Sequence, residues 1–178
     1  MTRIVAGSAR GRRLEVPPGN GTRPTSEKVR GAVFNVLGQF FDGGAVLDLY
    51  AGSGALALEA LSRGCERALC VEGDRRAAEV LRRNVAALGW EGRVEVRVGQ
   101  VEVVAPRLPA GFTLAFVDPP YADGPEAALA LLPAHLAPGA RVVAEHDDRR
   151  PPPEVVGALR LLDRRRYGDT GISIYGLD

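Results

Sequence analysis

The 178-residue chain has little of several features that would place it in a special class of protein. It has only two cysteines, Cys65 and Cys70, which form neither a disulfide framework nor the spacing of a metal site. No apolar run reaches the ~18–20 residues that a membrane-spanning helix needs. Residues 1–10 also lack the apolar segment of a signal peptide. We therefore expect a cytoplasmic protein with no metal and no membrane partner.

Lysine is almost missing as well, since Lys28 is the only one and arginine supplies nearly all the positive charge. The formal net charge is only +1, but the charges are unevenly distributed. Residues 1–40 hold seven basic and two acidic residues, whereas acidic residues are in excess in the remainder. A basic segment on a mildly acidic body indicates an anionic partner. A solvated arginine-rich face or a compositional bias would give the same pattern.

Strand-like and helix-like segments alternate from residue 45 onward. The strand patterns occupy residues 45–50, 67–72, 93–98, 112–117 and 140–145. Helical periodicity fills residues 53–63, 74–88 and 124–137 between them. This order predicts an α/β fold with a mostly parallel sheet and helices on both faces. We expect the prolines at 151–153 to open a short helix, and residues 160–167 and 172–176 to form a closing hairpin.

The first 41 residues follow a different pattern. Residues 3–16 read as two short strands around a glycine-containing turn, with arginine at the tip. Thr25 or Ser26 then caps a helix that we expect to run to about Phe41. The sequence thus divides into a basic hairpin and helix, residues 1–41, and a sheet-forming body, residues 42–178.

The first strand of the body runs into a glycine loop, DLYAGSGAL at residues 48–56. Gly52 and Gly54 allow a sharp turn and close approach of the backbone to a ligand at the carboxyl end of the sheet. Glu72 ends the next strand, where a carboxylate can accept hydrogen bonds from two ribose hydroxyls. The loop matches both the dinucleotide fingerprint and the A-G-x-G loop of S-adenosylmethionine (SAM) methyltransferases. A glycine-rich turn that binds nothing is a third interpretation.

Asp48 favours SAM over a dinucleotide. A pyrophosphate at this loop would meet an unfavourable negative side chain, whereas SAM brings a sulfonium cation and an ammonium group. After the third strand, the amide oxygen of Gln100 can accept a hydrogen bond from the adenine amine. The predicted cofactor contacts are Asp48, Ala51, Gly52, Ser53, Gly54, Glu72 and Gln100.

The motif DPPY, residues 118–121, follows the apolar strand 112–117. The Asp118 carboxylate and the Pro119 carbonyl can hold the exocyclic amine of a nucleobase and return electron density to its nitrogen. Pro119 and Pro120 fix the backbone and donate no N–H. Tyr121 offers a flat face on which the base can stack, an interaction worth ~1–3 kcal/mol. The alternative is an Asp-Pro turn beside a core tyrosine.

With these motifs the chain resembles the RsmD-type methyltransferases, which make N2-methylguanine in small-subunit (16S) ribosomal RNA. The resemblance spans nearly the whole chain and includes RIVAG at 3–7, RPT at 23–25, FN at 34–35, the glycine loop, DPPY, and YGDT at 167–170. Gly31 and Gln100 depart from the usual Glu and Asp of such sequences.

The resemblance implies a Rossmann-like, seven-stranded SAM-dependent methyltransferase sheet behind an RNA-facing N-terminal hairpin and helix. It implies SAM as cofactor, catalysis by the DPPY residues, and the assembled small ribosomal subunit as partner. The residues expected to contact RNA are Arg3, Arg10, Arg12, Arg13, Arg23, Thr25 and Arg30.

Three other functions stay open on the residues alone. A DNA amino-methyltransferase acting on adenine N6 or cytosine N4 would use the same DPPY chemistry. A nicotinamide oxidoreductase would use the same glycine loop, and a ribosome-assembly factor would keep the fold without catalysis. The small size leaves no room for a separate DNA target-recognition domain, and we expect a monomer.

Overall fold

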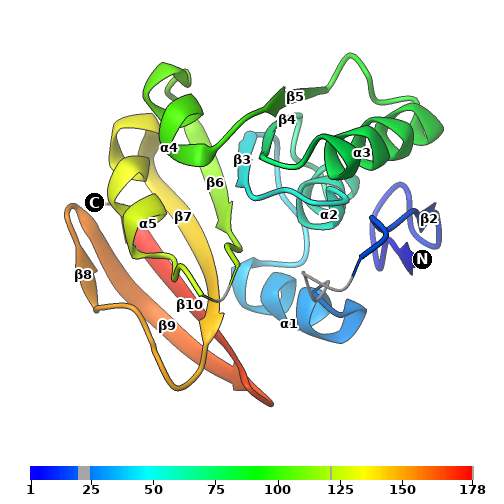
Figure 1. Cartoon of the computed structure of the whole chain (residues 1–178). Helices are drawn as coiled ribbons and strands as arrows, with labels where there is room; N and C mark the ends of the chain where they lie inside the picture. Colours follow the sequence, from blue (N-terminus) through cyan, green and yellow to red (C-terminus); the bar gives the residue numbers. More distant parts are fainter. Residues whose placement is uncertain (20–24, 121, 178) are drawn as a thin grey trace.

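A computed structural model describes residues 1–19, 25–120 and 122–177 of the chain (Figure 1). In chain order the elements are β1 (Thr2–Arg3), β2 (Arg13–Leu14), α1 (Glu27–Leu37), β3 (Ala45–Leu49), α2 (Ala55–Ser62), β4 (Arg67–Glu72), α3 (Arg75–Leu88), β5 (Val94–Val98), α4 (Val101–Val104), the 3-10 helix η1 (Ala105–Arg107), β6 (Phe112–Val117), α5 (Glu126–Leu131), the 3-10 helix η2 (Leu132–His135), β7 (Leu136–Asp147), β8 (Val155–Val156), β9 (Leu159–Tyr167) and β10 (Thr170–Leu177).

The main sheet has the strand order β5-β4-β3-β6-β7-β10-β9-β8. Neighbouring strands from β5 to β7 are parallel, and β10, β9 and β8 extend the sheet with antiparallel pairings. All residues of the central strand β3 are buried, as expected for a parallel strand covered on both faces. Leu49 at the end of β3 is in register with Val71 of β4 and Val117 of β6. The loops after these three strands therefore meet at one edge of the sheet.

Two separate cores cover the two faces of the sheet. One contains apolar residues of the N-terminal hairpin, α1, α2 and α3, including Ile4, Leu14 and Phe34. The other contains residues of α4, η1, α5 and η2, including Val101 and Leu129. Figure 1 shows the hairpin, α2 and α3 gathered on one side and α4 and α5 on the other. The alternating helices and the mostly parallel sheet predicted from the sequence are confirmed.

The N-terminal hairpin and α1 pack into the same core as the helices of the body. Ile4 and Leu14 are fully buried beside α2. In the segment that connects β1 and β2, Gly7 has a φ of +89°, and a Cβ at this position would lie 1.8 Å from the carbonyl oxygen of Ser62. Only glycine allows the backbones of the hairpin and α2 to approach so closely.

Some predicted elements differ from the observed ones. Within the described residues the main sheet has eight strands rather than seven, because Val155 and Val156 pair with β9 instead of following the prolines into a helix. Gly157, with a φ of +58°, turns the chain directly into β9. Helix α1 ends at Leu37 rather than near Phe41, because Gly38 takes a φ of +112° at its C-cap.

The predicted helix at 124–137 is a short helix, α5, followed by the 3-10 turn η2 that contains Pro133. The sequence pattern gave no signal for α4. None of the helices in the described residues is long and apolar enough to span a membrane.

Candidate active site at the carboxyl ends of strands β3 and β6

Asp48 places a carboxylate in the middle of the apolar sheet. It lies on β3 between Cys70 of β4 and Phe116 of β6, and it is 1% exposed. Neither of its carboxylate oxygens has a hydrogen-bond partner among the described residues. Burial raises the pKa of Asp48 to about 8, and the charge of Glu72 adds to the shift. A buried carboxylate without a partner is costly unless a positively charged group comes to it.

The glycine loop is fixed by Glu72 at the end of β4. The backbone N–H of Gly52 donates to Glu72 Oε2 at 2.7 Å, and the N–H of Asp74 donates to Oε1 at 2.9 Å. Gly54 takes a φ of +84° at the N-cap of α2, as the sequence predicts for this turn. Each carboxylate oxygen of Glu72 keeps a lone pair for a further donor, such as a ribose hydroxyl.

The other predicted cofactor residues lie around this loop. Ala51 donates its N–H to the carbonyl of Val71, and Ser53 accepts from the side chain of Asn84. The side chain of Gln100 lies next to Gly73, where a Cβ would be 3.2 Å from its Nε2 atom. The structure thus brings together the predicted residues on the ends of β3, β4 and β5.

Tyr50 and Asn84 belong to the same region but were not predicted as site residues. Tyr50 has a φ of +64°, the only positive φ of a non-glycine residue in the described chain. Asn84 ties the loop to the N-terminal segment, because its amide also donates to the carbonyl of Glu15. No sequence pattern marks Tyr50, since a left-handed tyrosine depends on the tertiary contacts of the loop.

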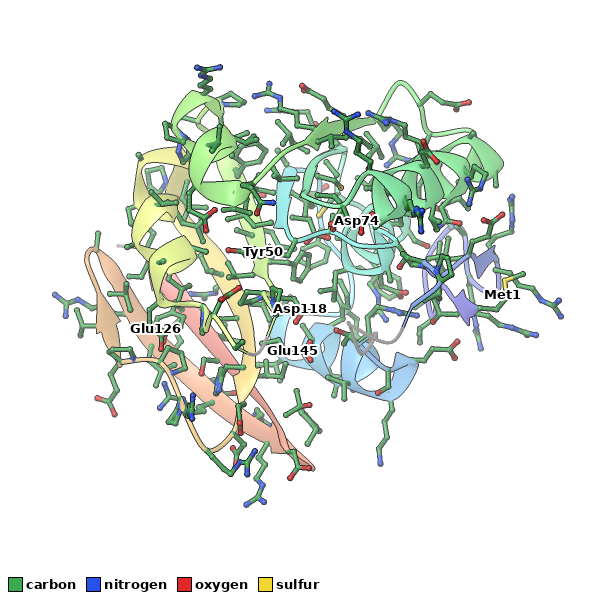
Figure 2. The ribbon with its side chains drawn as sticks, in the orientation of Figure 1. Met1, Tyr50, Asp74, Asp118, Glu126 and Glu145 are labelled. Atoms are coloured by element: carbon green, nitrogen blue, oxygen red, sulfur yellow. The ribbon has the colours of Figure 1, made fainter. Side chains whose placement is uncertain are left out.

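Asp118 follows β6 and lies beside the glycine loop, as its position after the fourth strand predicts. Thr25 joins it from the segment before α1, with its hydroxyl oxygen 3.1 Å from Asp118 Oδ2 and 2.6 Å from Glu145 Oε2. Figure 2 shows Asp118 and Glu145 next to each other. Burial and then the charge of Glu145 hold the pKa of Asp118 well above its usual range.

A cavity of about 180 Å³ opens on the β7 side of this cluster. The cavity is lined by Pro119 and Pro120, by residues 122–126 up to the start of α5, and by residues 145–147 with Arg150. Tyr121, the predicted stacking residue, lies outside the described residues. Glu145 was not predicted, although a carboxylate at the end of the apolar run in β7 repeats the pattern that marks Asp48 and Asp118.

The predicted RNA-contacting residues fall into four groups. Arg3, Arg10, Arg12 and Arg13 are exposed on the N-terminal hairpin. Thr25 lies at Asp118 instead of on an outer surface, and Arg23 lies outside the described residues.

Arg30 is the clear exception in this set. Its side chain is fully buried, where it pairs with Glu59 at 3.3 Å. Burial leaves no surface through which Arg30 can contact RNA, so its predicted role is wrong. The sequence alone does not reveal the burial of Arg30, because nothing in the sequence distinguishes an arginine that pairs with a buried glutamate from the exposed arginines of the same basic segment.

The raised pKa of Asp48 predicts how stability depends on pH without a ligand. The native state binds more protons than the unfolded state between the ordinary pKa of 3.8 and about 8. The free energy of unfolding therefore falls as pH rises through this interval, with a slope of up to ~1.4 kcal/mol per pH unit. Substituting Asp48→Asn should reduce this slope, as measured by urea unfolding at a series of pH values. An unchanged slope would mean that Asp48 does not titrate in this way.

Comparisons with known proteins identify the family and relatives of the chain. The family described as conserved hypothetical protein 95 matches residues 2–176. The Bacillus subtilis (strain 168) protein named "Putative rRNA methyltransferase YlbH" is 39% identical over 179 residues, covering 97% of each chain. "Ribosomal RNA small subunit methyltransferase D" of Escherichia coli (strain K12) is 39% identical over 122 residues, covering 68% of this chain and 61% of the relative.

A solved structure is similar over nearly its full length. The Escherichia coli protein described as "Putative methyltransferase yhhF" superimposes with a TM-score of 0.85 and is 33% identical, covering 99% of this chain and 97% of that one. The match includes the N-terminal segment as well as the sheet.

Proposed function

The chain belongs to the conserved hypothetical protein 95 family, the RsmD-type methyltransferases, and on this premise we propose that it transfers a methyl group from SAM to the exocyclic N2 amine of a guanine in small-subunit ribosomal RNA. We propose further that it acts on assembled small subunits, as a cytoplasmic monomer. The observation that carries the proposal is the pair of carboxylates at one edge of the sheet, Asp48 on β3 and Asp118 directly after the adjacent strand β6.

The residues at the glycine loop fit SAM. Asp48 is a buried carboxylate without a hydrogen-bond partner, which suits the positive charges of this cofactor. The oxygens of Glu72 are placed for the ribose hydroxyls, and the side chain of Gln100 lies on the same side of the loop for the adenine. When bound, SAM supplies an electrophilic methyl group.

Asp118 and Pro119 prepare the amine to accept this methyl group. The nitrogen is a weak nucleophile, because its lone pair is delocalised into the base. Hydrogen bonds from its two protons to the Asp118 carboxylate and the Pro119 carbonyl hold it and return electron density to it. Alignment of the nitrogen with the methyl group can supply a further ~7–11 kcal/mol of barrier reduction. After transfer, one N–H proton moves to Asp118, whose raised pKa makes it a good acceptor.

The N-terminal hairpin supports an RNA substrate. Arg3, Arg10, Arg12 and Arg13 are all exposed, and the hairpin is packed firmly onto the body. Arginines on a fixed surface can bind phosphates and orient the RNA while a base enters the site. The names of both relatives point to ribosomal RNA, and the name of the Escherichia coli relative points to the small subunit.

The test is methyl transfer from labelled SAM to three substrates: unmodified small ribosomal subunits, naked small-subunit RNA and duplex DNA. Each product is digested and the labelled nucleoside is identified. We expect N2-methylguanosine from subunits, with less from naked RNA. Label in adenine or cytosine of the DNA would show that DNA, and not ribosomal RNA, is the substrate. If SAM binds but no substrate is labelled, the result would favour an assembly factor without catalysis.

A further inference from the structure

The site holds a second carboxylate that the proposed chemistry has not used. Val117 of β6 and Ala144 of β7 are registered partners in parallel strands. The next residues along the chain are Asp118, directly after β6, and Glu145 of β7, and side chains of registered neighbours point to the same face. Glu145 is 7% exposed, and it lines the cavity beside Pro119 and Pro120. Glu145 therefore lies at the cavity and next to Asp118, since both carboxylates contact the same hydroxyl of Thr25.

The hydroxyl of Thr25 links the two acids. It lies within hydrogen-bond distance of both Asp118 and Glu145, but it has a single proton to donate. Both contacts are favourable only when one of the two acids is protonated. That acid donates to the Thr25 hydroxyl, and the hydroxyl donates to the carboxylate of the other acid. Without substrate, this geometry favours a state in which the two acids share one proton.

Guanine differs from the other amino bases at the atom next to its amine. In adenine and cytosine, the ring nitrogen bonded to the carbon that carries the amine has no hydrogen and is an acceptor. In guanine, the N1 nitrogen beside the N2 amine carries a hydrogen and is a donor. A guanine therefore presents two neighbouring donors, which two neighbouring carboxylates can accept.

Resting on the proposed function, we propose that Glu145 is the specificity-determining residue of the site and accepts the N1–H of guanine while Asp118 holds the N2 amine. Thr25 keeps the two carboxylates at the spacing of these two donors. When the base binds, the proton held between the acids leaves to solvent, and the N1–H takes its place as donor to Glu145. Adenine or cytosine would place a lone pair against Glu145 and be rejected.

The experiment compares two bases that share the N2 amine but differ at N1 and, because 2-aminopurine lacks the carbonyl of guanine, at C6; the change of their ratio in the Glu145 variant isolates the contribution of N1. Guanine carries a hydrogen at N1, whereas 2-aminopurine has an acceptor there. Each is placed in the RNA at the position that the labelling experiment identifies, and methyl transfer is measured as kcat/KM. The wild-type enzyme should prefer guanine by on the order of 10- to 100-fold, the discrimination that base-edge hydrogen bonds provide.

The Glu145→Gln variant should reduce this preference by on the order of tenfold, because an amide can either donate to N1 of 2-aminopurine or accept from N1 of guanine. Glu126→Gln is the matched control, since it removes a carboxylate from another wall of the same cavity. Figure 2 shows Glu126 apart from the pair of acids. The control should keep the wild-type ratio.

Two results would overturn the inference. One is a wild-type enzyme that methylates guanine and 2-aminopurine equally, which decides the matter even if Glu145→Gln does not fold. The other is a Glu145→Gln variant with the wild-type ratio. Neither affects the proposed function, which fails only when the wild-type enzyme forms no N2-methylguanosine.

Discussion

Replacing Asp118 with alanine should lower methyl transfer on the order of 10³-fold, or more, while SAM affinity stays near that of the wild-type enzyme. The substitution removes the charge-assisted hydrogen bond to the amine, and the loss of one such group aimed at a reacting centre costs a factor of ~10²–10³. Misalignment of the nitrogen adds to this loss. Asp48 and Glu72, which are placed for the cofactor, remain intact.

The same variant should not be less stable than the wild-type protein. Asp118 is a buried acid next to Glu145, and burial together with the charge of Glu145 raises its pKa. Its ionised form is therefore unfavourable in the folded protein, and alanine removes that cost. We expect a thermal midpoint equal to or above that of the wild-type protein. Lost activity with undiminished stability is the signature of a catalytic residue and not of a structural one.

The measurements are single-turnover methyl transfer, calorimetric titration with SAM, and thermal unfolding. Asp42→Ala is a suitable control, because Asp42 is exposed and precedes β3, at the opposite end of the strand from the site. It should match the wild-type enzyme in all three measurements. Full activity of Asp118→Ala would remove the catalytic assignment of DPPY.

The parts of the site that follow from local pattern could be predicted from the sequence. Asp48, Glu72 and Asp118 each end or interrupt an apolar strand, and parallel strands place their carboxyl ends at one edge. Once the strand order is known, these carboxylates must lie near one another. The main sheet was predictable for the same reason, since its strands and helices alternate in a regular way.

The parts that depend on contacts between distant segments could not be predicted. Thr25 is 93 residues from Asp118 and 120 from Glu145 along the chain, so no local pattern reveals their hydrogen bonds. The arginines of the N-terminal segment present the same problem, because composition does not separate exposed Arg10 from buried Arg30. The two-residue strand β8 also depends on its partner β9, because it is too short to produce a periodic signal.

Substituting Glu59→Ala should destabilise the protein by ~3–5 kcal/mol, the cost of leaving buried charges without their partner. Glu59 is fully buried in α2 and accepts from two arginines, Arg30 at 3.3 Å and Arg63 at 2.8 Å. It also accepts from the backbone N–H groups of Val5 and Ala6 at 2.9 and 3.0 Å. One side chain thus holds the N-terminal hairpin, α1 and α2 together.

The arginines have too few other acceptors to compensate for this loss. Arg30 also donates to the carbonyl of Arg3, and Arg63 donates to Gln39 and lies 4.5 Å from the centre of the Phe34 ring. Burial lowers the pKa of Arg30 even with Glu59 present. Without Glu59, two guanidinium groups would remain in the interior, and two backbone donors of the hairpin would lose their acceptor.

Urea unfolding tests this prediction, with Glu15→Ala as the matched control. Glu15 pairs with Arg83 of α3 at 3.0 Å, so it too links the N-terminal segment to a helix, but both side chains are about half exposed. An exposed pair of this kind contributes ~0–1 kcal/mol. The large difference between the two variants would show that burial decides the effect, since the charge change is the same. A loss below ~1 kcal/mol for Glu59→Ala would instead mean that water reaches the cluster. The hairpin would then be held by its apolar contacts, Ile4 and Leu14, alone.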